Sequence, residues 1–312
     1  MSTNRQDFLL HPQPRPLSRA GWRTAIITAV VLIAAILTIS IAYENEGDLS
    51  VTGGLVEPNI AGIVITVEPL SMDPATNTLT ARLVFSTRGS DFIDENSNTL
   101  LQNTRITVST TEGNQEISYT QGSHLGSAQV ILGTDGSVSC YPFDSHEADL
   151  YVEAETTKRE SGGGVTVLGD IPVGTLGAGG IAGWDVAMNM PTGMENGAQV
   201  SMVLHRAFST KLFAIVLLIT MTALALLALF IALLVTSGRR RMEVALLSWL
   251  GALLFALPLL RNSLPNSPPI GASIDILVFL WVLLAAMSAM LLAAITWTRA
   301  KKAELNALHQ DD

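Results

Sequence analysis

The stretch LFAIVLLITMTALALLALFIALLVT, residues 212–236, decides the fold class, because it contains no charged side chain over its whole length. An α-helix needs about 20 apolar residues to cross the ~30 Å hydrocarbon core of a bilayer. Three further apolar runs of similar length occupy residues 22–43, 242–260 and 274–297, with charges only near their ends. The sequence therefore predicts an integral membrane protein with four transmembrane helices, one N-terminal and three C-terminal.

The overall composition agrees with insertion in a bilayer. Only 14% of the 312 residues are charged, whereas a soluble globular chain carries about 25%. The formal net charge is −9, and such a negative field repels nucleic acid. The lipid bilayer is thus an expected partner, and nucleic acid is not.

Lysine and arginine in short loops set the orientation of membrane helices, because they are retained on the cytoplasmic side. They cluster before the first run, between the second and third runs, and after the fourth. The three groups are Arg5, Arg15, Arg19 and Arg23; Arg239, Arg240 and Arg241; and Arg299, Lys301 and Lys302. We therefore expect a multi-pass plasma-membrane protein with both termini in the cytoplasm.

The first apolar run, residues 22–43, permits two interpretations. Ser40-Ile41-Ala42 resembles the small-x-small site of a cleaved signal peptide. The run is, however, longer than the usual 7–15-residue apolar region of such peptides. We expect a retained anchor, with residues 1–21 as a disordered cytoplasmic tail and residues 298–312 as a second cytoplasmic tail; cleavage is the alternative.

Residues 44–211 form the expected extracytoplasmic domain, in which acidic residues outnumber basic ones by about three to one. Short β-branched runs, many of them alternating and separated by Gly, Asn and Asp clusters, predict strands. The runs are residues 60–67, 79–86, 104–110, 116–120, 128–132, 150–155, 165–168, 184–189 and 198–205. Their spacing predicts an antiparallel β-sandwich, with a long surface loop in the glycine-rich residues 161–183. The whole chain is then a membrane α+β protein, with residues 212–297 as a three-helix domain.

Cysteine supplies no crosslink within the chain. Cys140 is the only cysteine, so no intrachain disulfide can form. We expect it to be a buried apolar residue; an intermolecular bridge is the alternative.

The sequence offers no recognisable catalytic or metal-binding motif. His146-Glu147 begins like a metalloprotease motif, but the required second histidine position holds Leu150. His124, His146 and His205 are scattered along the chain, and no Gly-x-Ser-x-Gly elbow is present. We therefore expect a protein that is not an enzyme and that holds no metal or cofactor.

The most informative short motif is Cys140-Tyr141-Pro142-Phe143-Asp144. Proline fixes the backbone φ angle, two rings can anchor the segment in apolar surroundings, and aspartate can cap the turn or form an ion pair. A simple β-turn is the alternative interpretation.

This turn, together with the layout of one span, a β-rich domain and three further spans, resembles an actinobacterial membrane family of unknown function, DUF4436. The resemblance covers most of the chain and implies no activity.

The turn is also similar to a loop of pentameric ligand-gated ion channels. In that family an aromatic-Pro-Phe-Asp loop of the β-sandwich ectodomain rests on the membrane domain. The resemblance implies that Asp144 pairs with Arg206, which closes the last expected strand in the segment LHRAF, residues 204–208. The residues so assigned to coupling between domain and membrane are Tyr141, Pro142, Phe143, Asp144 and Arg206.

Residues 253–276, which include LPNS at 264–267, are similar to the end of the channel family's pore helix and its following loop. Other features depart from that family. The paired cysteines are missing, as in bacterial members, and residues 212–236 lack the family's proline. After the expected β-rich domain the family has four helices, and here no fourth helix follows Trp297; the N-terminal span, which runs in the same direction, could fill that place.

The run at residues 242–260 is also more apolar than the lining of an open aqueous pore. Its small residues Ser248, Ala252 and Ala256 form one helical stripe. Such a stripe is typical of close helix packing, and a pore-facing position is the alternative.

Two functions from different classes remain open. One is a non-catalytic membrane protein whose extracytoplasmic β-sandwich binds an unidentified partner or ligand, with helices that serve as an anchor and a surface for homo-oligomerisation. The other is a subunit of a ligand-sensing, pentameric, channel-like oligomer. The oligomeric state in detergent distinguishes them, because a monomer or dimer excludes a pentameric pore.

Overall fold

The computed structural model describes residues 61–308, except positions 90, 95–96, 98, 161–163, 191–196 and 267, together with scattered positions between 22 and 41. The chain divides into two compact units, Met1–Gly47 and Asp48–Asp312. The expected tail at residues 1–21 and most of the expected first span lie outside the described residues. All elements below belong to the second unit.

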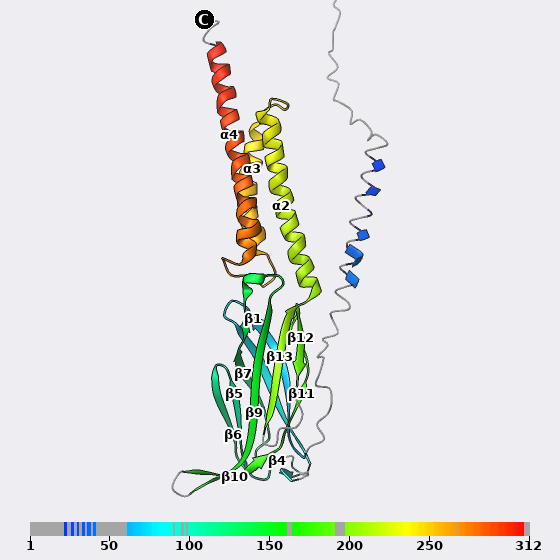
Figure 1. Cartoon of the computed structure of the whole chain (residues 1–312), viewed down its shortest axis with the longest axis vertical. Coiled ribbons are helices and arrows are strands. Elements are labelled where there is room, and N and C mark those ends of the chain that lie inside the picture. The colour runs from blue at the N-terminus through cyan, green and yellow to red at the C-terminus, as the bar shows by residue number, and fades with distance from the viewer. Residues whose placement is uncertain are drawn as a thin grey trace, which may run out of the picture. The chain divides into compact units, whose positions relative to one another are not determined.

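The β-rich part contains two large sheets (Figure 1). The first sheet has four strands in the order β11-β1-β2-β7. These strands are β1 (Gly62–Asp73), β2 (Thr78–Arg88), β7 (Ser127–Gly133) and β11 (Val173–Gly177). Burial alternates along most of β2, because successive side chains of a strand point to opposite faces of the sheet.

The second sheet has seven strands and is built around the long strand β9 (Ser145–Arg159). Its main path runs β12-β13-β9-β5-β6, and two further strands, β8 and β10, also pair with β9. Their bounds are β5 (Asn103–Thr110), β6 (Gly113–Tyr119), β8 (Asp135–Gly136), β10 (Val165–Ile171), β12 (Trp184–Asn189) and β13 (Ala198–Arg206). A short hairpin of β3 (Ile93–Asp94) and β4 (Thr99–Leu100) forms its own small sheet.

One hydrophobic core joins the two large sheets. Ile65 and Leu83 reach it from the first sheet, and Ile106, Leu150 and Val200 reach it from the second; all five are fully buried. Full burial of such a side chain stabilises the fold by about 1.5–3 kcal/mol. The expected β-sandwich is therefore present.

Two details differ from expectation. Strand β11 runs parallel to β1, with Ile63 opposite Val173, so the sandwich is not wholly antiparallel. The strand expected at residues 165–168 is present as part of β10, but β10 continues to Ile171 and β11 follows it, within the segment expected to contain a long surface loop; Ile171 enters the core with 1% of its surface exposed. The β-branched residues in this segment fit a pleated, half-buried surface, and their pattern outweighs the glycines.

Three long apolar helices follow the sandwich: α2 (Phe208–Thr236), α3 (Val244–Asn262) and α4 (Leu280–Leu308), the last preceded by a π-helical segment, η2 (Asp275–Phe279). Among the described residues, three helical segments are long and apolar enough to cross a membrane. The fourth expected span, the N-terminal run at residues 22–43, is not among these three, and most of its residues lie outside the described ones. Helix α2 begins at Phe208 rather than at residue 212, and α4 continues into the segment expected to be a tail.

Helices α2 and α4 contact each other through alanines, which allow two helix backbones to approach closely. These alanines are at most 1% exposed: Ala225, Ala228 and Ala232 on α2, and Ala286, Ala289 and Ala293 on α4. They follow the spacing i, i+3, i+7 in both helices, a pattern of small residues that is visible in the sequence.

Helix α3 joins this cluster through leucines. Leu250, Leu253 and Leu257 are its buried positions in the cluster. Ser248 and Ala252 are exposed and Ala256 is half-buried. Within one chain, leucines and not the small-residue stripe therefore form the contact face of α3.

Candidate functional site

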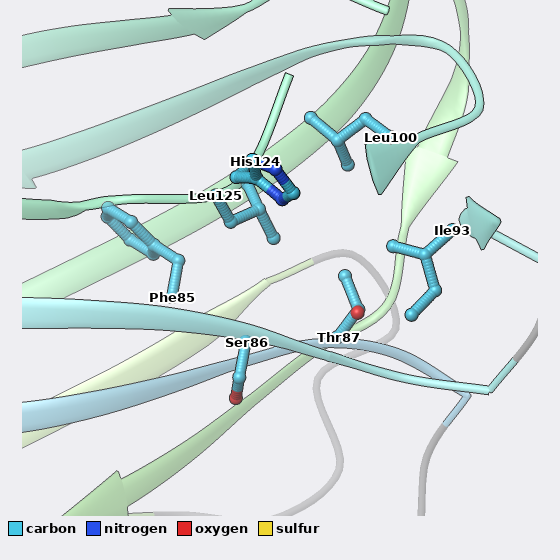
Figure 2. A pocket seen from close by; sticks show the side chains of 7 residues that line it. All are labelled: Phe85, Ser86, Thr87, Ile93, Leu100, His124 and Leu125. Carbon is cyan, nitrogen blue, oxygen red and sulfur yellow. The ribbon is translucent and has the colours of Figure 1, made fainter. Parts of the chain in front are cut away.

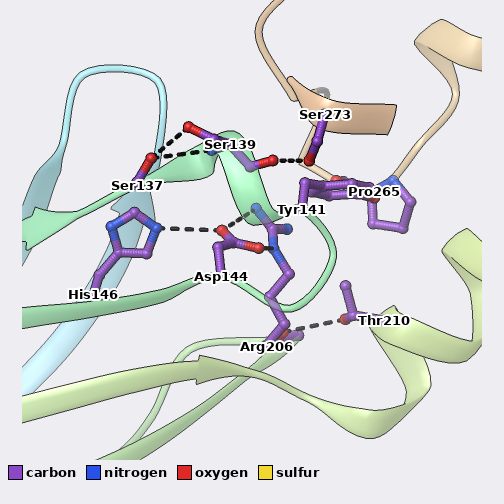
Figure 3. Close-up of polar contacts among 10 residues, drawn as sticks. Ser137, Ser139, Tyr141, Asp144, His146, Arg206, Thr210, Pro265 and Ser273 are labelled. Atoms are coloured by element: carbon purple, nitrogen blue, oxygen red, sulfur yellow. Dashed lines mark hydrogen bonds and ion pairs between the residues drawn. The ribbon is translucent and has the colours of Figure 1, made fainter. Parts of the chain in front are cut away.

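The turn that the sequence singled out lies where the sandwich meets the helices (Figure 3). A short 3₁₀ helix, η1 (Val138–Cys140), leads into it, and Ser137 caps η1 by accepting a hydrogen bond from the Ser139 backbone N–H. The bond between Tyr141 and Pro142 is cis. Strand β9 starts at Ser145, so the turn places Asp144 at the end of the central strand of the larger sheet.

Asp144 and Arg206 form a two-point ion pair. Arg206 donates from Nε to Asp144 Oδ1 at 2.6 Å and from Nη2 to Oδ2 at 3.0 Å. Both side chains are fully buried. The pair expected from the sequence is therefore present, in the fork geometry that makes arginine–carboxylate contacts strong.

Two aromatic rings contact the buried guanidinium. Its central carbon lies 4.5 Å from the centre of the Tyr141 ring and 4.7 Å from that of Trp184. Trp184 stands directly opposite Arg206 in the pairing of β12 with β13, so strand register brings them together. Ring faces attract cations, and this attraction offsets part of the cost of burying the charge.

His146 completes the buried cluster. Its Nε2 lies 3.2 Å from Asp144 Oδ2, and its ring meets Trp184 edge to face with centroids 5.7 Å apart. Gly136 of β8 runs so close to His146 that a side chain there would collide with the imidazole and with the Ser145 carbonyl oxygen. The imidazole is thus held by its neighbours on several sides.

The environment controls the ionisation of two groups in this cluster. Burial raises the pKa of Asp144, but hydrogen bonds from His146 and Arg206 and the charge of Arg206 outweigh it, so the pKa of Asp144 lies below its usual value. Burial raises the pKa of Tyr141 to about 12. Asp144 is therefore a carboxylate at neutral pH, and Tyr141 is a neutral phenol.

Tyr141 also reaches the membrane helices. Its hydroxyl donates to the carbonyl of Pro265, in the loop between α3 and α4, at 3.2 Å. Ser273, in the same loop, donates to the carbonyl of Ser139. The Tyr141 side chain belongs to an apolar cluster with Ala214, Leu264, Ala272 and Ile274. The turn therefore contacts α2 and the α3–α4 loop together.

The backbone itself forms a second connection between the sandwich and the helices. Only Ala207 separates β13, which ends at Arg206, from α2. The backbone N–H of Ala207 and the hydroxyl of Thr210 both donate to the Gly183 carbonyl, at 3.0 and 3.1 Å. The start of α2 is therefore fixed to the residue that directly precedes β12, the strand that pairs with β13.

The α3–α4 loop has its own ion pair, which the sequence analysis missed. Arg261 donates from Nε and Nη2 to the two carboxylate oxygens of Asp275 at 2.8 and 2.7 Å, and from Nη2 to the Pro269 carbonyl at 3.2 Å. The Gly271 N–H donates to Asp275 as well. The sequence contains a signal for this pair, because Arg261 and Asp275 are the two charged residues in the segment that joins the last two spans.

The remaining predicted residues fall in different places. Pro142 is buried with Tyr141. Phe143 is 66% exposed, so only one of the two rings anchors the turn. Cys140 is exposed, which corrects the expectation that it is buried; it lies in the surface layer of the turn, where the inward positions belong to Tyr141 and Asp144.

The sandwich also contains a cavity of about 170 Å³ (Figure 2). It is lined by Phe85, Ser86, Thr87, Ile93, Leu100, His124 and Leu125. Asn103, close in sequence to the lining, pairs with Thr157 near the end of β9, whereas the ion pair lies before its start at Ser145. At about 3.3 Å per residue, roughly 40 Å of strand separates the two places.

Fold and site together define a class of protein: a β-sandwich that holds a buried ion pair where it meets helices of membrane-spanning length. Residues 55–204 match the domain of unknown function DUF4436, and residues 206–300 match the domain of unknown function DUF8686. The resemblance to DUF4436 is therefore confirmed over residues 55–204, and residues 206–300 are similar to DUF8686. A comparison with curated proteins gave no match.

The family boundary coincides with the candidate site. Asp144 lies within the region that matches DUF4436, and Arg206 is the first residue of the region that matches DUF8686. The ion pair therefore connects the two domains at the point where they join.

Proposed function

We propose that the chain is a non-catalytic integral membrane protein whose extracytoplasmic β-sandwich binds a partner or ligand, and that the turn at residues 141–144 transmits binding to the helices. In this proposal the protein spans the plasma membrane four times, with both termini in the cytoplasm. The observation that carries it is the Tyr141 side chain, which contacts the buried Arg206 on one side and donates to Pro265 on the other.

The cavity beside Phe85 is the proposed ligand site. Its volume of about 170 Å³ is below the roughly 300–1,000 Å³ of sites for drug-sized molecules, so the ligand we propose is smaller, and the lining offers it aromatic, aliphatic, hydroxyl and imidazole groups. Strand β9 extends from the neighbourhood of this cavity to the ion pair, and a packed sheet moves as a unit more readily than it deforms. We therefore propose that β9 transmits the effect of ligand binding from the cavity to the ion pair.

The test uses Cys140, the single and exposed cysteine, labelled with an environment-sensitive fluorophore in the full chain in lipid nanodiscs. Thr87→Trp fills the cavity and imitates a bound ligand, so it should shift the emission at Cys140. Gln129→Trp, at an exposed position on the same sheet, is the matched control and should not. Arg261→Gln, which breaks the ion pair of the α3–α4 loop, serves as the positive control. A response to Arg261→Gln without one to Thr87→Trp would contradict the proposal.

A subunit of a ligand-sensing pentameric oligomer is the second candidate. It is favoured by the face of α3 that carries Ser248 and Ala252, which the chain itself leaves exposed. The same face also exposes Phe255 and Leu259, which suit lipid or a second copy better than water. Native mass spectrometry in detergent separates the candidates, since a monomer or dimer excludes the pentamer.

A further inference from the structure

We infer that the loop between α2 and α3 binds the phosphate headgroup of an anionic phospholipid. A cavity of about 270 Å³ opens there, lined by Ile231, Val235, Arg240, Arg241, Glu243, Leu246 and Trp249. This inference is independent of the proposed ligand cavity in the sandwich and of any transmission through the turn.

The position of the cavity places it at a membrane surface. Helix α2 starts beside the sandwich and has 29 residues, so its far end lies about 40 Å away, across a bilayer. Thr236 at that end accepts a hydrogen bond from Thr296 of α4, and Lys301 lies over the Trp297 ring at 5.3 Å. Tryptophan and lysine at one level mark the boundary between lipid tails and water.

The charge of the lining selects an anion. Arg240 and Arg241 are exposed, and within the described residues neither forms an ion pair or a side-chain hydrogen bond. Helix α3 begins at Val244, and no side chain caps its N-terminus, so its first N–H groups and the positive end of its dipole also favour an anion. Glu243 opposes this preference, because its carboxylate lines the same cavity.

The apolar part of the lining selects a lipid over a soluble anion. Ile231, Val235 and Leu246 continue the cavity along the two helices, in the direction that an acyl chain takes below its headgroup. Trp249 keeps 38% of its surface exposed, and an indole suits the level of the glycerol backbone. One site thus offers guanidinium groups to the phosphate of a lipid and an apolar wall to the acyl chain of the same lipid.

The test is native mass spectrometry of the delipidated full chain, titrated with phosphatidylglycerol or with phosphatidylcholine of the same acyl chains. Phosphatidylglycerol should bind more tightly. Arg240→Gln and Arg241→Gln should each weaken its binding about fivefold, the loss expected for one basic residue at an anionic lipid. Arg239→Gln, in the same loop but outside the cavity lining, is the matched control and should change binding less than about twofold.

Glu243→Gln should tighten binding, a gain that misfolding cannot produce. Equal loss in all three arginine variants would indicate general charge attraction and overturn the site, as would equal binding of the two lipids. Excess inorganic phosphate should not displace the lipid; full displacement would indicate a site for soluble phosphate and contradict the lipid assignment.

Discussion

The guanidinium of Arg206 holds the carboxylate of Asp144 at two points, 2.6 and 3.0 Å, with both side chains fully buried. Removing one partner leaves the other charge buried and unpaired, which costs about 3–5 kcal/mol of folding free energy. Asp144→Ala and Arg206→Ala should each show that loss in denaturant unfolding of the full chain. The double variant should lose less than the sum, with a coupling energy above about 1 kcal/mol.

The exposed pair of Arg82 and Glu68, at 3.4 Å, is the control for this cycle. Arg82→Ala should change stability by less than about 1 kcal/mol, because water screens the pair. Additive losses at Asp144 and Arg206 would mean that Asp144 only caps its own turn.

The pH dependence of stability follows from the lowered pKa of Asp144. A carboxyl group whose pKa is lower in the folded state stabilises the protein fully above its unfolded pKa, near 3.8. That contribution is lost as the pH falls from there through the lower folded pKa. The stability difference between wild type and Asp144→Asn should thus be constant above about pH 5 and shrink below about pH 4. Urea unfolding between these values measures it; a difference that grows toward acid would have the wrong sign.

Helix packing gives a third prediction. Ala289 of α4 is fully buried in the alanine contact with α2, so Ala289→Leu should cost about 1–3 kcal/mol by overpacking. Ala252→Leu, on the exposed face of α3, should leave the thermal stability of the isolated chain unchanged. If copies associate through that face, Ala252→Leu should also abolish the oligomer seen by native mass spectrometry. Equal destabilisation by both changes would contradict the assignment of the two faces.

Topology can be measured directly. A cytosolic reporter fused after Asp312 should be active, and a protease site inserted at residue 163 should be cut from outside intact cells, because the arginine clusters predict that the loop after α2 and both termini lie inside. A C-terminus accessible from outside would reverse the orientation of every helix.

The resemblance to the channel family's loop predicts the ion pair, and both partners also stand out in the sequence. Asp144 follows two aromatic residues and a proline, and Arg206 is the last arginine before a long apolar run. The sequence does not predict the contacts of Trp184 and His146, because these contacts depend on which residues face each other across β12, β13 and β9. A shift of one residue in register would turn either side chain to the other face.

In the helices, too, the sequence does not show which residues face each other. Apolar length predicts where a helix lies, but both the stripe at Ser248 and the alanines of α2 and α4 have the small-residue spacing of a contact face. Their neighbours decide between them: the alanines face one another, whereas Ser248 is exposed. The glycine-rich composition of residues 161–183 predicts a long loop beside the strand at residues 165–168, because composition does not show that Ile171 reaches the core.

In the proposed function, the turn couples the sandwich to the helices. Hydrogen–deuterium exchange of the full chain in nanodiscs tests it most directly, with Asp144→Asn compared with Asp149→Asn, an exposed acid on β9. Loss of the Asp144 charge should loosen the turn and release Tyr141 from Pro265, so amides at residues 264–274 should exchange faster, while Asp149→Asn leaves them unchanged. Faster exchange confined to the sandwich, with residues 264–274 as protected as in wild type, would show that the turn does not couple the sandwich to the helices.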